Sequence, residues 1–164
     1  MEIERKFLVT EFPENLELYP HNELEQAYLA SSGTTVRVRK IDDSYVLTVK
    51  KKPRASEDST VANVNEEIEE EIPGDLYERL LRYAESAVVK KTRYRIPFCG
   101  YTVELDVYHG VLEGLATAEI EYESVEAAAA SPLPEWFGRE VTNESEYRNS
   151  ALAKLTSVES LPLS

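Results

Sequence analysis

Charged side chains occur at every second position in short runs, from the first residues of the chain to about residue 121. A step of two places side chains on one face of a β-strand, whereas on an α-helix the same residues would point in diverging directions. Because strand-forming residues separate the charges, the pattern predicts strands near residues 2–9, 24–30, 34–41, 44–51, 62–72, 87–97, 101–108 and 116–123. The short connections favour antiparallel neighbours, since a parallel crossover needs roughly a dozen residues or more.

Two segments carry helical signals instead. The first covers residues 75–84, where Asp75 can act as the N-cap and leucines follow at helical spacing. The second covers residues 143–155, beginning at Asn143 and presenting Tyr147 on its apolar stripe. Both segments are amphipathic, so we expect each to cover an apolar outward face of the strands.

The remaining segments predict loops within one domain. Residues 52–63 form a polar excursion, and residues 124–135 predict a short helical turn followed by a link that prolines interrupt. The chain has neither an internal repeat nor a second composition regime. We therefore expect a single domain over residues 1–164, of mainly antiparallel α+β type.

Two orientations of the strands are compatible with the pattern. In the usual sheet, the apolar face makes the core and the charged face meets water. In the alternative, the charged stripes face inward around a shared polar space that could hold cations and a polyanion together. Runs of both signs in so acidic a chain favour the inward orientation. The sequence does not fix the phase of the strands, so both orientations stay open at this point.

The charge balance narrows the classes of partner. The formal net charge of −13, from 18 Lys and Arg against 31 Asp and Glu, opposes binding to nucleic acids and to anionic membranes. The single Cys99 cannot form an internal disulfide and fits a reducing compartment, where we expect it to be a buried thiol. With no signal-peptide pattern and no long apolar stretch, we expect a cytoplasmic protein. The expected oligomeric state is a monomer or a homodimer.

Carboxylates without Cys or His partners predict a site for a hard divalent cation. Oxygen ligands of this kind suit Mg²⁺ or Mn²⁺ better than Zn²⁺. The two histidines, His21 and His109, stand apart and predict surface or turn roles. The candidate metal ligands are Glu2, Glu4, Glu67, Glu69, Glu119 and Glu121.

Side chains must also hold any bound phosphate, because the glycine-rich phosphate loops that end at a helix N-terminus are absent from the sequence. Arg gives bidentate contacts to phosphate oxygens, and Lys supplies a compact point charge. The candidate substrate-binding residues are Lys6, Arg37, Arg39, Lys50, Lys91 and Arg93. Six cations facing six carboxylates leave the enclosed face near neutral, so burial is tolerable if the interior is hydrated and open at one or both ends.

These residues lie in motifs that resemble the CYTH superfamily, the triphosphate tunnel metalloenzymes. In chain order the motifs are EIERKFLV with Glu2, Glu4 and Lys6, QAYL, TVRVR, VLTVK, NEEIEEEIP, KKTRYRIP, VELDVYHG, GLATAEIEY and the tail WFGREVTNESEYRNSALA. The resemblance implies an eight-stranded closed antiparallel β-barrel, with helices outside and a charged lumen that binds triphosphate and divalent metal. One departure is Asn65, where many small relatives carry Arg; Lys51, Lys52 or Arg54 could replace that contact.

The leading hypothesis is metal-dependent hydrolysis of a small triphosphate, most simply inorganic triphosphate to diphosphate and phosphate. The candidate catalytic residues are Glu2, Glu4, Lys6, Glu119 and Glu121. The alternatives are a class IV type of adenylate cyclase, a thiamine or nucleoside triphosphatase, and a triphosphate-binding sensor without turnover. Four further charged residues share the strand phase and predict either support of the site or a solvated rim: Glu71, Arg95, Glu104 and Asp106.

Overall fold

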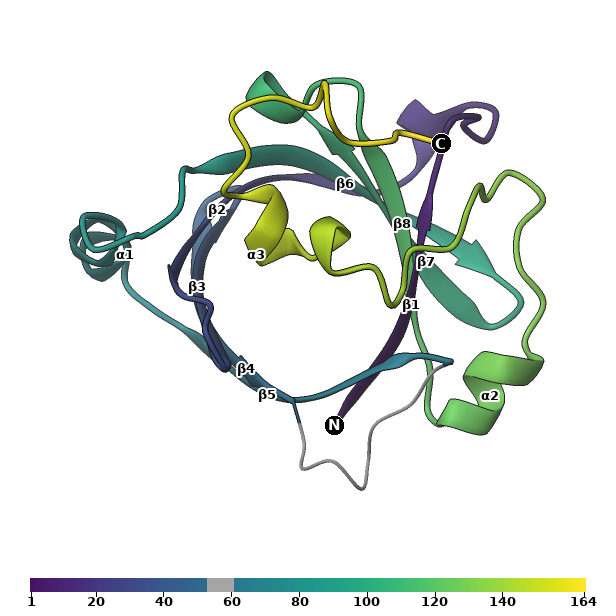
Figure 1. Ribbon diagram of the computed structural model, residues 1–164, viewed down its shortest axis with the longest axis horizontal. Coiled ribbons are helices and arrows are strands. Elements are labelled where there is room, and N and C mark those ends of the chain that lie inside the picture. Colours follow the sequence, from purple (N-terminus) through teal and green to yellow (C-terminus); the bar gives the residue numbers. More distant parts are fainter. Residues whose placement is uncertain (53–60) are drawn as a thin grey trace.

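Eight antiparallel strands close into a barrel in the computed structural model, which describes residues 1–52 and 61–164 (Figure 1). The strands are β1 (Glu2–Leu8), β2 (His21–Ala30), β3 (Thr34–Ile41), β4 (Ser44–Lys51), β5 (Asn63–Glu71), β6 (Val89–Phe98), β7 (Tyr101–Tyr108) and β8 (Ala116–Glu121). Around the barrel they follow the order β1-β5-β4-β3-β2-β6-β7-β8. The predicted strands and the predicted closed barrel are confirmed, with β2 starting three residues earlier than expected. Most of the polar excursion expected over residues 52–63 lies outside the described residues.

The charged stripes face the inside of the barrel, and the apolar core lies outside the barrel wall. Outward side chains of β7 and β8, such as Leu105 and Ile120, are almost completely buried in a cluster that includes Ala128 of α2. On β3, the inward Arg37 and Arg39 alternate with the buried Val38. The usual sheet orientation is therefore wrong for this chain, because its acidic and basic stripes face one another across an enclosed space.

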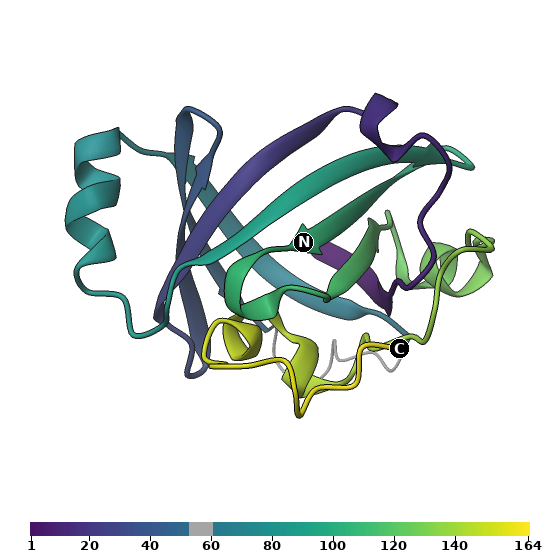
Figure 2. The same cartoon turned by 90° about the horizontal axis from the view of Figure 1, so that it is seen from above.

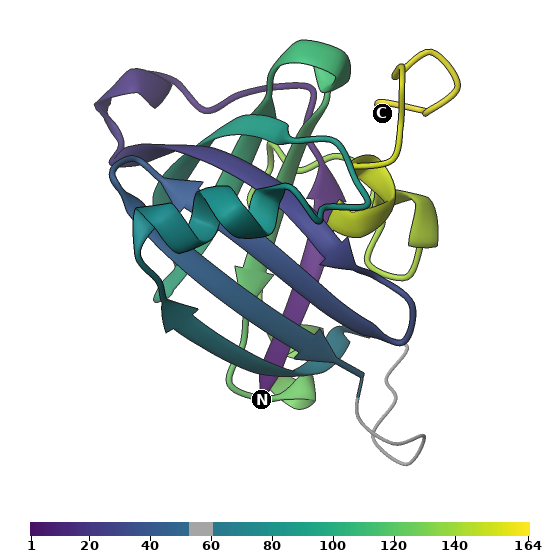
Figure 3. The same cartoon turned by 90° about the vertical axis from the view of Figure 1, so that its left-hand side faces the viewer.

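Two helices pack on the outer surface of the barrel. Helix α1 (Gly74–Leu81) lies over the outer face of β2, β3 and β4, as predicted (Figure 3). Its buried residue is Tyr77, which was not among the predicted apolar positions. Its N-cap is Pro73 rather than the predicted Asp75. Because Gly74 already has helical backbone, Asp75 lies in the first turn, where its charge complements the helix dipole.

Helix α2 (Val125–Ala130) forms the short helical turn predicted after β8 and contacts β1. The Ser124 hydroxyl caps it by accepting a hydrogen bond from the Ala127 amide at 3.0 Å. The link that follows brings Trp136 against Phe137, with ring centroids 4.9 Å apart, over the same apolar cluster. Trp136 therefore has a packing role.

The C-terminal segment differs from the expected continuous helix. It contains a 3-10 helix η4 (Ser145–Tyr147), an extended residue Arg148 and the short helix α3 (Asn149–Leu152). The helix is interrupted because the Tyr147 carbonyl accepts a hydrogen bond from Lys6 Nζ at 2.8 Å.

The position of this segment also differs from the expectation. It lies across one end of the barrel, whereas the pattern predicted packing on the outer face (Figures 1 and 2). Its apolar stripe, with Tyr147 and Leu152, packs against the strand ends at Leu8, Tyr28 and Tyr108. The amphipathic pattern was therefore a correct sign of burial but did not specify the surface that is covered.

The turn between β6 and β7 contains Cys99 and Gly100, both with positive φ, at 47° and 81°. Cys99 is exposed, so the expected buried thiol is wrong. The side chain of a turn residue at the open end of the barrel has no apolar surface to cover it. Within the described residues, each helix is too short or too polar to cross a membrane.

Candidate functional site

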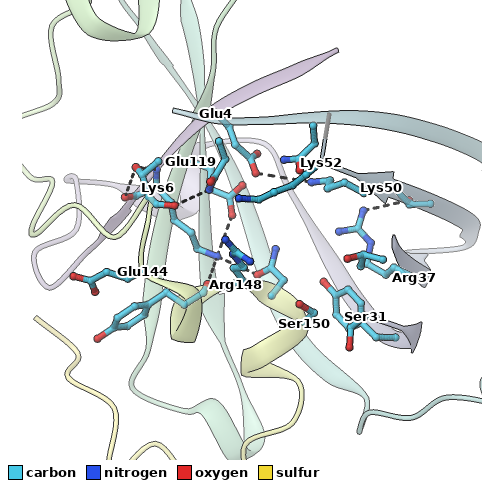
Figure 4. Close-up of a pocket in the computed structure, with 18 of the residues that line it drawn as sticks. Glu4, Lys6, Ser31, Arg37, Lys50, Lys52, Glu119, Glu144, Arg148 and Ser150 are labelled. Atoms are coloured by element: carbon cyan, nitrogen blue, oxygen red, sulfur yellow. Dashed lines mark hydrogen bonds and ion pairs between the residues drawn. The ribbon is translucent and has the colours of Figure 1, made fainter. Parts of the chain in front are cut away.

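The barrel encloses two adjoining cavities. The first, about 400 Å³, lies beneath the C-terminal segment and is called the covered cavity (Figure 4). The second, about 660 Å³, extends toward the β6–β7 turn and is called the distal cavity. Residues that line both are Glu4, Arg37, Lys50, Glu119 and Asn149. The interior is therefore one polar tunnel with a covered end and a distal end.

All six predicted acidic residues line the distal cavity: Glu2, Glu4, Glu67, Glu69, Glu119 and Glu121. The strand register explains why residues far apart in sequence meet there. In the pairing of β1 with β8, Glu4 lies opposite Glu121 and Lys6 lies opposite Glu119. In the pairing of β7 with β8, Glu104 lies opposite Glu119.

Glu4 and Glu119 form a closely coupled pair of carboxyl groups. Burial raises the pKa of Glu4 well above its ordinary value, and the nearby Glu119 charge raises it further. Although burial also acts to raise the pKa of Glu119, the Lys6 charge and the hydrogen bond with Glu4 lower it to about 2. The pair therefore favours a proton on Glu4 and a negative charge on Glu119.

The acidic set fits a hard divalent cation in its donor chemistry. The buried Oε1 atoms of Glu2 and Glu119 each lie beside an ammonium group, but neither accepts a hydrogen bond from a described residue. Glu2 is 2.5 Å from Lys50 Nζ, and Glu119 is 3.4 Å from Lys6 Nζ. Within the described residues, no three His, Cys, Asp or Glu side chains already stand together as a metal site. A bound cation would therefore require these carboxylates to turn away from the two lysines.

Five of the six predicted cations reach the tunnel. Lys6 lines the covered cavity, Arg39 and Arg93 line the distal cavity, and Arg37 and Lys50 line both. Arg39 is buried and donates from Nε to Gln26 Oε1 at 2.9 Å. Burial, together with the charges of Arg37 and Arg93, lowers the pKa of Arg39 to about 9. This cluster of like charges is suited to a bound anion.

Lys91, the sixth predicted cation, lines neither cavity. Its side chain is fully buried, with Nζ 2.7 Å from Asp106 and 5.3 Å from the ring centroid of Tyr108. Asp106 also accepts two hydrogen bonds from Arg93, at 2.7 and 2.9 Å. Although burial acts to raise the pKa of Asp106, the Arg93 and Lys91 charges hold it well below its ordinary value. Asp106 thus neutralises Lys91 and fixes the side chain of Arg93.

Of the further charged residues that share the strand phase, some line the tunnel and others do not. Arg95 and Glu104 line the distal cavity, and Glu104 lies 2.6 Å from Arg93. Glu71 is exposed and lines neither cavity. The two histidines lie outside both cavities: His21 packs on Tyr94, and His109 contacts Thr92.

Several residues that line the covered cavity were not predicted from the sequence. Asn149 accepts hydrogen bonds from Lys6 and Tyr108, the Tyr147 carbonyl accepts from Lys6, and Arg148 lies between them along the chain. A continuous helix would have placed these residues on different faces. Their only signal was the resemblance of the tail motif. Two residues from the sequence discussion also line the covered cavity. They are Asn65, which stands where many small relatives carry Arg, and Lys52, a candidate to replace that contact.

Comparisons with known proteins agree with this architecture. The CYTH domain family matches residues 1–156. An inorganic triphosphatase from Nitrosomonas europaea is 38% identical over 157 residues, which cover 93% of this chain and 96% of that relative. An inorganic triphosphatase from Acetivibrio thermocellus is 40% identical over 122 residues, which cover 73% of this chain and 72% of that relative.

The structural comparison gives the same result. A crystal structure described as that of an inorganic triphosphatase superimposes with a TM-score of 0.68 at 35% sequence identity, covering 96% of this chain and 97% of the other. The motifs, the closed barrel and these matches lead to one conclusion. The chain belongs to the CYTH domain family.

Proposed function

We propose that this protein hydrolyses inorganic triphosphate to diphosphate and phosphate inside the barrel. The observation that carries this proposal is the convergence of six carboxylates and five predicted cations on one enclosed tunnel. A site for the anion alone would not need the carboxylates, whereas a site for an anion and a metal needs both. The relatives named inorganic triphosphatase, at 38% and 40% identity, support the same substrate.

The carboxylates hold a divalent cation, Mg²⁺ or Mn²⁺. Glu2, Glu4, Glu119 and Glu121 are its principal ligands in this proposal, with Glu67 and Glu69 completing the acidic set. Such a cation supplies polarisation of phosphate oxygens and a lower pKa for bound water. The raised pKa of Glu4 opposes its ionisation, so binding of a cation by this carboxylate would be favoured at higher pH.

The cations hold the substrate for in-line attack by water on the terminal phosphorus. The bond from that phosphorus to the bridging oxygen breaks, and diphosphate leaves. Lys6, Arg37, Arg39, Lys50 and Arg93 hold the triphosphate oxygens and offset the charge that grows on the leaving group. An unligated carboxylate of the acidic set accepts the proton of the attacking water. Lys91, the remaining predicted substrate-binding residue, acts indirectly in this proposal, because it shares the Asp106 carboxylate that fixes the Arg93 side chain.

The direct test is phosphate release by the purified protein. Inorganic triphosphate, thiamine triphosphate and ATP are compared at equal concentration, with Mg²⁺ or Mn²⁺ and with a chelator. We expect metal-dependent release to be fastest from inorganic triphosphate. Cyclic AMP as the dominant product from ATP would replace the proposal with a cyclase. A lasting rise in melting temperature with metal and triphosphate, without phosphate release, would indicate a sensor.

Arg39→Ala is expected to weaken substrate binding more than turnover. Arg39 is buried in the distal cavity near two other cations, so its removal takes away a charge-assisted contact to phosphate. We expect KM for inorganic triphosphate to rise roughly tenfold while kcat changes by only a few-fold. Steady-state kinetics check this, with Arg79→Ala on the exposed side of α1 as the control. An unchanged KM would exclude Arg39 from the substrate site.

The partners follow from the same charge balance. A net charge of −13 opposes nucleic acids and anionic membranes, so the partner is a small anion that reaches the cations inside the tunnel. We propose that the protein acts in the cytoplasm as a monomer or a homodimer. Sedimentation of the purified protein distinguishes these two states.

A further inference from the structure

The two ends of the tunnel carry opposite charge. Among described residues, five cations and three carboxylates line the covered cavity. In the distal cavity, eight carboxylates outnumber five cations. An anion is therefore attracted most strongly to the covered end. The wall formed there by β5 contributes only the uncharged Asn63 and Asn65, so the other strands and the C-terminal segment supply the positive charge.

Arg148 is a cation of the covered cavity without a partner (Figure 4). Lys6 is engaged by Glu119 and by the C-terminal segment, Lys50 by Glu2, and Arg37 by Thr48. Within the part of the chain that the structure describes, the Arg148 guanidinium has neither a hydrogen bond nor an ion pair. Its donors are therefore free for a ligand in the cavity.

The residues on both sides of Arg148 are held in place by Lys6. Lys6 Nζ donates to the Tyr147 carbonyl at 2.8 Å and to Asn149 Oδ1 at 3.2 Å. Asn149 Oδ1 also accepts from the Tyr108 hydroxyl at 3.0 Å. Arg148 itself has extended backbone, with φ −64° and ψ 140°, between η4 and α3. A residue fixed in this way on both sides presents its side chain from a defined point on the cavity wall.

We propose that Arg148 is a substrate-binding residue that contacts a terminal phosphate group at the covered end of the tunnel. The triphosphate then lies along the tunnel, with one end beneath the C-terminal segment and its middle at Arg37 and Lys50, which line both cavities. Guanidinium is well suited to this contact because it offers two parallel donors to phosphate oxygens. This inference rests on the proposed function.

The test is the split between KM and kcat in Arg148→Gln. Arg148 is exposed and unpaired, so the variant should keep the wild-type melting temperature. We expect KM for inorganic triphosphate, measured with Mg²⁺ at fixed ionic strength, to rise roughly tenfold. We expect kcat to stay within about threefold of wild type, and Arg148→Lys to recover most of the loss in KM.

A matched control is Arg79→Gln, which removes the same charge from the exposed surface of α1 and should leave KM unchanged. An unchanged KM in Arg148→Gln, or an equal rise in the control, overturns the role of Arg148 while the triphosphatase proposal stands. A fall in kcat at constant KM likewise overturns it. If the wild-type protein releases no phosphate from inorganic triphosphate, the proposed function itself fails.

Discussion

Glu119→Gln is expected to remove metal-dependent phosphate release while leaving the barrel folded. Glu119 is a carboxylate of the tunnel that lies 3.4 Å from Lys6 Nζ, and its pKa is lowered to about 2. The amide keeps the shape of the side chain but removes the negative charge that a divalent cation needs. We expect kcat/KM with inorganic triphosphate to fall by more than about a hundredfold. Mutation of residues that only support metal ligands already lowers metal affinity or activity by about 10- to 100-fold, and a direct ligand should matter more.

Glu4→Gln is expected to have the same effect on activity but a different effect on stability. Because burial and the Glu119 charge raise the pKa of Glu4, the folded protein favours the neutral form of this side chain more than the unfolded chain does. An amide resembles the protonated acid, so we expect the melting temperature to stay unchanged or to rise. Calorimetry and phosphate release on the same preparation separate the two effects.

The control for both variants is Glu70→Gln, on the exposed outer side of β5. It changes the net charge equally but lies away from both cavities, so phosphate release should be unchanged. Full turnover in both Glu4→Gln and Glu119→Gln would remove these two residues from the metal site.

Asp106→Asn is expected to have the largest effect on stability. The Asp106 carboxylate is 1% exposed and is the shared counterion of Lys91 and Arg93. Its loss leaves Lys91 without a counterion and Arg93 with Glu104 as its remaining partner. Breaking a buried ion pair costs about 3–5 kcal/mol. Urea unfolding at pH 7 should therefore show a loss of free energy of unfolding of about 3 kcal/mol or more.

The pH dependence of this loss gives a second test. The pKa of Asp106 is lowered in the folded protein from an ordinary value of 3.8, so its contribution is present above that pH and declines as the pH falls below it. The difference between wild type and Asp106→Asn should therefore narrow in acid. Asp43→Asn, at an exposed turn, should match wild type at every pH. A constant small difference would mean that the buried ion pairs contribute little.

The sequence by itself determined the strands and the residues that share each face. The step of two between charges is a local property of β-structure, so all eight strands were predicted near their observed bounds. The ordered motifs also identified the family and a closed barrel, and all six acidic candidates line the tunnel. That residues 1–164 act as one domain stays a prediction, as do the individual roles of the site residues.

Only the tertiary structure decided which face of each strand lies inside. Alternation is unchanged when a strand is turned over, so the inward orientation had to come from barrel closure and from the apolar cluster outside the wall. Closure of the barrel also determined which charged side chains form ion pairs with one another. Lys91 was expected at the substrate, but cross-strand packing placed it against Asp106, away from both cavities.

The C-terminal segment was also decided by long-range contacts. Its local pattern favours a continuous helix. That helix does not form, because the Tyr147 carbonyl accepts a hydrogen bond from Lys6, which lies about 140 positions earlier in the chain. That hydrogen bond and the packing on Leu8 hold Arg148 in an extended conformation at the end of the tunnel. Local periodicity specifies which side chains share a face, whereas the surface that buries them depends on contacts between residues distant in the chain.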